Sequence, residues 1–403
     1  MLVQKNFSDI VTFARATTRW RTGPAGLLVQ DAINAASLAY DPVTLLPRGL
    51  LVEGQKTNVQ MQSSGFDNVI WSKTNCTITP NAAVDPVGTS VAQKLVEGTA
   101  ANSVSRATGN VISKAASAIE YTASVYVKAA GRNFVRVGMD DSSGSGAAVW
   151  FSLTDGAIGA STGTGTTAFT NISGKVSQLA NGWYRCAITA TTTTTTVIRF
   201  LVDPSTTNAI GGNLYTGDGV SGIYLFGAQL EVGAFPSSYI PTTSASVTRS
   251  ADSTLITDLS KIAFNPIEGT FYAEFMRTFS DGANAALNGR LISRDSMADG
   301  IIGTSSGNFI ETYSGGVALR TGNQFTPSVA AKAAVSYSSA GRSLCLNGGT
   351  VASDANPLVV PTQLISIGSA GSSSNTNNFN GFIRDIRYIP RRLSNAELQA
   401  LTA

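Results

Sequence analysis

Four glutamates within or beside predicted β-strands are the residues best suited to acid–base chemistry: Glu120, Glu231, Glu274 and Glu311. A glycosidase needs two carboxylates that face each other across a cleft, about 5 to 9 Å apart. The sequence leaves open whether any two of these side chains converge, and none lies in a recognisable catalytic motif. We therefore expect no enzymatic activity and assign no catalytic residue.

The chain contains no histidine. This excludes Ser-His-Asp and Cys-His nucleophile systems, together with His-ligated zinc or iron. Cys76, Cys186 and Cys345 are widely spaced and form neither a CxxC pair nor a disulfide framework. We expect them to be small buried side chains.

Three aspartates beside predicted loops are the candidate metal ligands: Asp140, Asp141 and Asp295. Calcium takes about six to eight oxygen ligands, and the chain has no spacing like that of an EF-hand loop. Solvated turns are the favoured interpretation. We expect no cofactor, with a structural Ca²⁺ ion as the alternative.

Aromatic side chains suit a sugar-binding surface, because the C–H face of a sugar stacks on an aromatic ring. Trp71, Trp150, Trp183 and Tyr184 are the candidates. For each of them a place in the core is the favoured interpretation, since aromatic residues dominate cores. Trp150 follows a Gly/Ser-rich stretch and is the best candidate for an exposed ring. We name Trp150 and Trp71 as candidate glycan-binding residues.

The low charge content separates this chain from nucleic-acid-binding proteins. Of 403 residues only 13% are charged, and the net charge is +3, so there is no basic field of the kind that binds nucleic acid. No apolar run approaches membrane-spanning length. The N-terminus lacks the basic and apolar regions of a secretory signal. We expect a protein made in a cytoplasm that does not insert into a membrane.

Short strands joined by small-residue turns predict an all-β protein of tandem antiparallel sandwiches. Apolar and polar residues alternate over 121–128, and the stretch 197–202 is apolar enough for a central strand. The Gly/Ser/Thr-rich stretches 142–148 and 156–167 are predicted to be exposed loops.

The second half of the chain shows a further set of strand signals. The stretch 269–276 alternates as a strand does, and Asn347-Gly348 is a strong hairpin signal. Ser394 and Glu397 form a capping box that predicts a short C-terminal helix. We divide the chain into an extended N-terminal attachment or packing segment (1–62), a first sandwich (63–250) and a second sandwich (251–403). The N-terminal segment is expected to pack on the next domain or on a neighbouring subunit.

Several sequence blocks carry a resemblance to bacteriophage tail and virion proteins, in which a carbohydrate-binding-module-like jelly roll precedes a concanavalin A/laminin-G-like domain. The blocks are 13–18 (FARATT), 40–44 (YDPVT), 48–58 (RGLLVEGQKTN), 66–71 (FDNVIW), 181–185 (NGWYR), 227–252 (GAQLEVGAFPSSYIPTTSASVTRSAD) and 387–398 (RYIPRRLSNAEL). Within this pattern, Glu231 is expected to fix the adjoining loop through a hydrogen bond or an ion pair.

The resemblance implies a virion structural protein of the tail or capsid surface, made in the cytoplasm of a bacterial host. It implies a tail-fibre or tail-tip receptor-binding component that contacts host-surface glycans, is a homotrimer and touches other virion proteins. The alternatives are a capsid head fibre or decoration protein without sugar binding, and a polysaccharide-degrading enzyme on a jelly-roll scaffold. Arg19/Arg21 and Arg391/Arg392 are expected to form ion pairs with a neighbouring subunit or with the domain surface.

Overall fold

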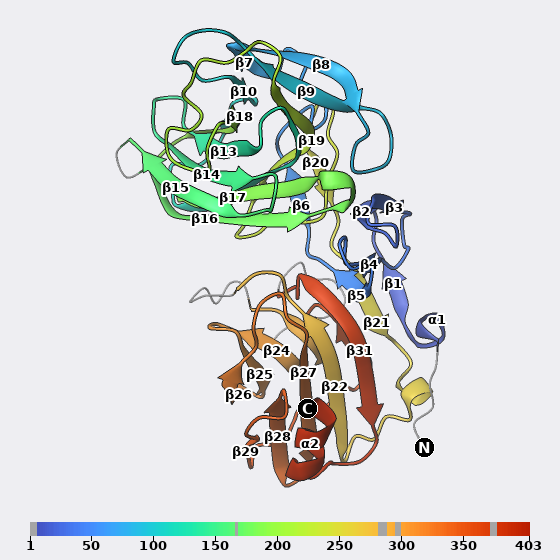
Figure 1. Ribbon diagram of the computed structural model, residues 1–403. Coiled ribbons are helices and arrows are strands. Elements are labelled where there is room, and N and C mark those ends of the chain that lie inside the picture. Colours follow the sequence, from blue (N-terminus) through green and yellow to red (C-terminus); the bar gives the residue numbers. More distant parts are fainter. Residues whose placement is uncertain (1–5, 166–167, 281–287, 295–299, 371–376) are drawn as a thin grey trace.

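A computed structural model describes residues 6–165, 168–280, 288–294, 300–370 and 377–403. These residues form two antiparallel β-sandwiches, with only short helices (Figure 1). The predicted all-β class with tandem sandwiches is therefore confirmed. Among the helices of the described residues, none has the length and apolar character needed to span a bilayer.

The first sandwich consists of two facing sheets. One runs, in spatial order, β16 (Phe169–Gln178), β17 (Tyr184–Thr192), β12 (Ile119–Ala130), β19 (Gly222–Val232), β9 (Ala92–Glu97) and β8 (Cys76–Ala83). The other runs β15 (Ile158–Thr164), β14 (Gly146–Ser152), β13 (Phe134–Asp140), β18 (Val197–Ser205), β10 (Arg106–Thr108) and β7 (Ser72–Thr74), with β11 (Ile112–Ser113) also paired to β18.

The core of this sandwich follows from side-chain alternation along its strands. Tyr121, Ala123, Val125 and Val127 of β12 all enter the main apolar core, as the period-two pattern predicted. Tyr126 points to the opposite face of the same sheet and joins a separate apolar cluster there. The six-stranded sheet is therefore buried on both faces.

The second sandwich also has two sheets. One runs β1 (Thr12–Ala14), β21 (Ser253–Ile256), β30 (Ile365–Ile367), β23 (Arg290–Arg294), β24 (Gly300–Ser305), β25 (Phe309–Ser314) and β26 (Val317–Gln324). The other runs β29 (Ala352–Asp354), β28 (Gly341–Leu346), β27 (Ala331–Ser338), β22 (Gly269–Met276), β31 (Gly381–Ile389), β5 (Pro47–Val52) and β4 (Leu38–Tyr40).

The N-terminal segment supplies strands to this second sandwich. β1 pairs with β21, and β5 pairs with β31 from the far end of the sequence. Leu50 and Val52 of β5 lie in the second core. We expected the segment to pack on the next domain or on another subunit. Part of the segment packs on the next domain, as expected, and part adds strands to the more distant sandwich of its own chain, where β5 pairs with the edge of β31.

The remaining N-terminal elements contact the first sandwich. The hairpin of β2 (Arg19–Thr22) and β3 (Leu28–Asp31) places Leu28 against the outer face of the six-stranded sheet. β6 (Lys56–Asn58) pairs with β20 (Val247–Arg249). In Figure 1 the strands β2 to β5 lie between the two sandwiches. The N-terminal segment thus joins both halves.

Short helices and turns follow the local signals. The helices are α1 (Phe7–Ile10), α2 (Asn395–Thr402) and the 3-10 turns η1 (Ala180–Gly182) and η2 (Leu259–Ile262). Ser394 and Glu397 make both hydrogen bonds of the predicted capping box at α2. Asn347 and Gly348 both have positive φ, as a tight hairpin turn requires.

Two loop predictions were wrong. The stretch 156–167 contains β15, and 142–148 includes the start of β14. Apart from Ile158, these segments consist of Gly, Ala, Ser and Thr, and they lack the alternating apolar residues that reveal a strand. β15 forms at the edge of its sheet because β14 offers it backbone partners, a contact that small side chains do not prevent.

An aromatic stack connects the two sandwiches. Phe235 follows β19 of the first sandwich, and Phe279 follows β22 of the second. Their ring centroids lie 3.9 Å apart at an interplanar angle of 8°, and both rings are buried. Lys56 lies 5.0 Å from the first ring and Arg277 lies 4.3 Å from the second. Cation–π contacts therefore cover the stack on both sides.

We predict that Phe235→Ala loosens the junction between the sandwiches. Removing a buried ring should lower the free energy of unfolding by about 3 kcal/mol and allow the two sandwiches to separate. Small-angle X-ray scattering should then give a larger radius of gyration. Phe264→Ala is the matched control, since Phe264 packs on Phe271 and Tyr388 within the second sandwich alone. An equal change in radius for both variants would contradict a joining role for Phe235.

Candidate functional site

Residues of the blocks 13–18, 48–58 and 227–252 meet with Arg19 in one buried cluster of charged side chains at the junction. Asp252 accepts a hydrogen bond from the backbone N–H of Glu53 at 2.7 Å. It also pairs with Arg15 at 3.3 Å and with Arg19. The side chains of Arg15, Arg19 and Asp252 are fully buried. Each buried charge therefore has a partner, which burial requires.

Glu53 is the second carboxylate of this cluster. It accepts hydrogen bonds from the backbone N–H and the hydroxyl of Ser238 at 2.9 and 2.7 Å. Arg19 and Arg249 lie 3.4 and 3.5 Å from its Oε2. Burial alone would raise the pKa of Glu53, but Arg249, Arg19 and the Ser238 hydrogen bonds hold the pKa at about 2.

The loop after β19 is held by the polar side chains of the 227–252 block. Glu231 accepts from the backbone N–H and the hydroxyl of Ser237, at 2.8 and 2.6 Å. Gln229 accepts from the N–H of Ile240 at 2.8 Å, and Asn58 donates to the Ile240 carbonyl at 2.9 Å. The expected loop-fixing role of Glu231 is confirmed. The polar side chains of this block therefore hold the loop after β19 in its conformation.

The arginine clusters form ion pairs within this chain. Arg19 joins the buried cluster just described, and Arg21 makes two bonds to Asp31, at 2.8 and 2.9 Å. Arg391 pairs with Glu397 at 2.8 Å, and Arg392 donates to the hydroxyl of Ser338 at 2.6 Å. Arg21 and Arg391 therefore form ion pairs within this chain, whereas Arg19 is paired in the interior rather than at the domain surface, and in the described part of the chain Arg392 makes a hydrogen bond rather than an ion pair.

A cavity of about 340 Å³ lies beside the buried cluster, where the N-terminal segment and both sandwiches meet. Its volume falls at the lower end of the range for small-molecule sites, about 300–1,000 Å³. Ser177 and Gln178 are exposed residues of its lining, so the cavity can be reached from solvent. Its aromatic lining residues come from all three parts of the chain: Trp20, Tyr40, Tyr126, Phe235, Tyr239 and Phe382.

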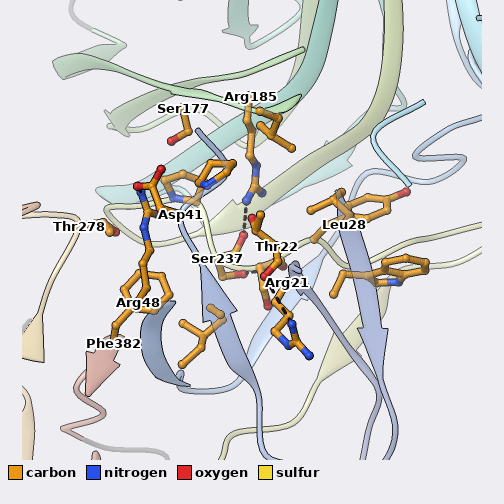
Figure 2. A pocket seen from close by; sticks show the side chains of 18 of the residues that line it. Arg21, Thr22, Leu28, Asp41, Arg48, Ser177, Arg185, Ser237, Thr278 and Phe382 are labelled. Carbon is orange, nitrogen blue, oxygen red and sulfur yellow. Dashed lines mark hydrogen bonds and ion pairs between the residues drawn. The ribbon is translucent and has the colours of Figure 1, made fainter. Parts of the chain in front are cut away.

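Charged side chains enter this cavity from opposite sides. Figure 2 shows Arg48 beside Asp41, above Phe382, and Arg185 directed from the first sandwich toward Ser237. Arg48 pairs with Asp41 at 2.7 Å. Arg185 donates to the carbonyl of Ser237 at 2.6 Å. Arg185 is held by backbone and hydroxyl oxygens rather than by a carboxylate.

The two predicted glycan-binding tryptophans are buried elsewhere. Trp71 is 1% exposed, donates to the Gln62 carbonyl at 2.9 Å and packs on Phe66. Trp150 is 2% exposed and lies under the Arg136 guanidinium, 5.5 Å from its ring centroid. The prediction of an exposed Trp150 was wrong, because this residue lies inside strand β14 and not in the Gly/Ser loop before it. Neither indole can stack on a sugar from solvent.

The aromatic residues that do line the cavity were missed. Tyr126 belongs to β12 and faces away from the main core, so its place in the alternating pattern was a usable signal. Trp20 carried no comparable signal. It reaches the cavity only because the β2–β3 hairpin packs on the six-stranded sheet.

The remaining candidate carboxylates do not form a catalytic pair in the described part of the chain. Glu274 pairs with Arg384 at 3.0 Å, and Glu311 lies 3.3 Å from Arg290. Glu120, whose pKa is raised by burial, lies on β12 outside the cavity lining.

The candidate calcium ligands serve other contacts. Asp140 makes two bonds of 2.7 Å to Arg199. Asp141 accepts from the backbone of Ser143 and Ser145, at 2.9 and 3.1 Å, and so holds its own turn. Asp295 lies outside the described residues. Within the described ranges, no three Cys, Asp or Glu side chains gather in a group that could hold a metal ion.

Comparisons with known proteins find only distant structural likeness. No family model matches the chain, and no curated protein matches it. Among solved structures, a Ruminococcus gnavus sialidase CBM40 bound to α2,3-sialyllactose is 17% identical. The match covers 34% of this chain and 84% of the CBM40 chain, with a TM-score of 0.28.

Two further likenesses extend over more of the chain. A Trypanosoma rangeli sialidase in complex with sialic acid is 9% identical over 82% of this chain, with a TM-score of 0.30; the chain spans 62% of that protein. The LG4-5 domains of the mouse laminin α1 chain are 12% identical over 70% of this chain and 90% of their own, with a TM-score of 0.23. These likenesses are too distant to indicate an activity or a ligand for this chain.

We predict that Glu53→Gln destabilises the protein by about 3 kcal/mol, because the buried Arg249 loses its charge partner and Arg19 keeps only Asp252. The change should also make the free energy of unfolding less dependent on pH in the acid range. With a pKa of about 2 in the folded chain against an ordinary value of 4.5, Glu53 contributes stability above pH 4.5. That contribution, on the order of 3 kcal/mol, is lost as the pH falls from 4.5 toward 2. Urea unfolding at several pH values measures both effects.

Glu274→Gln is the matched control for this measurement. Its ion pair with Arg384 is partly exposed, and such pairs contribute less than about 1 kcal/mol. If Glu53→Gln unfolds no more easily than Glu274→Gln and keeps the full acid dependence, Glu53 does not stabilise the junction.

Proposed function

We propose that the protein is a structural component of a bacteriophage virion, a tail-fibre or tail-tip protein that contacts glycans on the host surface. The virion assignment rests on the resemblance of the 13–58, 227–252 and 387–398 blocks. On this proposal the protein resides in the tail or capsid surface, is a homotrimer and contacts other virion proteins.

The cavity at the junction is the proposed glycan site, and it is the observation that supports adhesion. It has a volume suited to a monosaccharide-sized ligand, aromatic residues in its lining and several hydrogen-bonding groups. Aromatic rings can contact the C–H face of a sugar while the polar groups contact its hydroxyls. Many such weak contacts, repeated on an oligomer, would give strong attachment.

We further propose that the site binds without cleaving. In the described part of the chain, Asp41 and Glu53 are the carboxylates that line the cavity. Burial opposes their ionisation, but hydrogen bonds from Thr44 and Val43 and the pairing with Arg48 hold the pKa of Asp41 at about 2. The pKa of Glu53 is also about 2. A glycosidase requires one carboxylic acid that stays protonated near neutral pH, and neither residue meets this requirement.

We predict that the full chain binds host cells and a subset of glycans on an array. Ser177→Trp should reduce this binding at least tenfold, because the new indole would fill the cavity entrance. Ser173→Trp, at another exposed position of β16 outside the cavity lining, is the matched control. The full chain is needed because residues 1–62 supply strands to the second sandwich.

Three outcomes would count against parts of this proposal. Absence of any binding to cells or glycans would favour a head-fibre or decoration protein without sugar binding. Release of shorter sugars from a bound oligosaccharide would favour the enzyme. Antibody labelling of the capsid alone, seen in virions under the electron microscope, would contradict the tail assignment.

A further inference from the structure

The cavity holds more positive than negative charge. Four cationic side chains line it, and two of them have carboxylate partners: Arg21 with Asp31, and Arg48 with Asp41. Lys175 and Arg185 have no carboxylate within ion-pair distance among the described residues. The remaining lining carboxylate, Glu53, is already shared by Arg19 and Arg249. The net charge of the cavity is therefore positive.

Of the two cations Lys175 and Arg185, Lys175 has the less compensated charge. It projects from β16, is partly buried and donates one hydrogen bond, to the backbone carbonyl of Thr278. Burial, followed by the positive charges of Arg185 and Arg48, lowers its pKa to about 8. A buried ammonium group near two guanidinium groups is unfavourable in the absence of an anion.

A structural role accounts for only part of this arrangement. The bond from Lys175 to Thr278 connects the first sandwich to the second. An ammonium group has three N–H donors, so one carbonyl leaves two for another partner. A connection to a carbonyl also does not account for a second cation, Arg185, in the lining of the same cavity.

The surroundings of these cations favour a ligand that is both anionic and ring-shaped. Arg185 lies over the Tyr126 ring, 5.3 Å from its centroid. Tyr126 and Tyr239 are buried and pack edge-on at 6.0 Å, and the half-buried Trp20 lies 6.4 Å from Tyr239. A carboxylate on a sugar ring would meet the cations while the ring contacts the half-buried side chains of Trp20 and Tyr40 in the lining.

We propose that this cavity selects acidic sugars, with Lys175 and Arg185 as the partners of the sugar carboxylate. The inference depends on the proposed glycan-binding function and specifies its ligand class. Lys175 then serves two roles, as the charge that recognises the ligand and as a link between the sandwiches.

Glucuronate and glucose are the probes that test this proposal, because they differ only in a carboxylate against a hydroxymethyl group at C6. Isothermal titration of the full chain should give glucuronate at least tenfold tighter binding than glucose. Lys175→Met, which keeps an apolar stem, should remove this preference by weakening glucuronate alone, and Lys175→Arg should retain it. Lys94→Met is the matched control, since Lys94 also donates to one backbone carbonyl, that of Val220 at 2.9 Å, outside the cavity lining.

The outcomes separate this inference from the proposed function. Equal affinity for glucuronate and glucose, or unchanged glucuronate binding by Lys175→Met, would overturn the selection of acidic sugars and leave glycan binding intact. Acetate that binds as tightly as glucuronate would also overturn it, because the cavity would then recognise charge without the sugar. Failure of every saccharide to bind would overturn both. If Lys175→Met does not fold, the two probes with wild type and Ser177→Trp decide the question.

Discussion

The buried pairing of Asp252 and Glu53 with arginines is the interaction on which the rest of this structure depends. Arg15, Arg19 and Arg249 come from sequence positions on both sides of the first sandwich, and each pairs with Asp252 or Glu53 where the two sandwiches meet. Loss of one partner would leave an uncompensated charge among buried side chains. The same cluster, through Ser238, fixes the loop that forms one wall of the cavity. Junction geometry and site geometry therefore share one electrostatic origin.

Features set by neighbouring residues could be predicted from the sequence. The alternating pattern of β12, the Asn347-Gly348 turn and the Ser394/Glu397 capping box each depend on interactions over a few residues. Glu231 was also assigned its loop-fixing role correctly, because its partner Ser237 is only six residues away. A repeating pattern or a nearby partner can be read from a short stretch of sequence, which is why these features could be recognised.

Features that depend on distant pairing could not be predicted. β15 has few apolar residues and is a strand only because β14 pairs with it. Trp150 was taken for an exposed ring because its covering partner, Arg136, lies on another strand. The cavity could not be predicted for the same reason. Its lining residues Trp20, Lys175 and Phe382 are far apart in the sequence, and no local pattern indicates that they are neighbours. A site formed by residues from separate segments of the chain has no recognisable sequence pattern in any one segment.

The pairing of β5 with β31 has a consequence for the order in which the protein is made. Gly54 and Asn380, which are hydrogen-bonded beside these strands, are 326 residues apart. During synthesis β5 must therefore stay unpaired with its partner until β31 has been made. Contacts of such long range slow folding. Because Arg48 reaches the cavity from β5, a truncated product of interrupted translation would lack a finished binding surface, so only chains synthesised past β31 could compete for ligand.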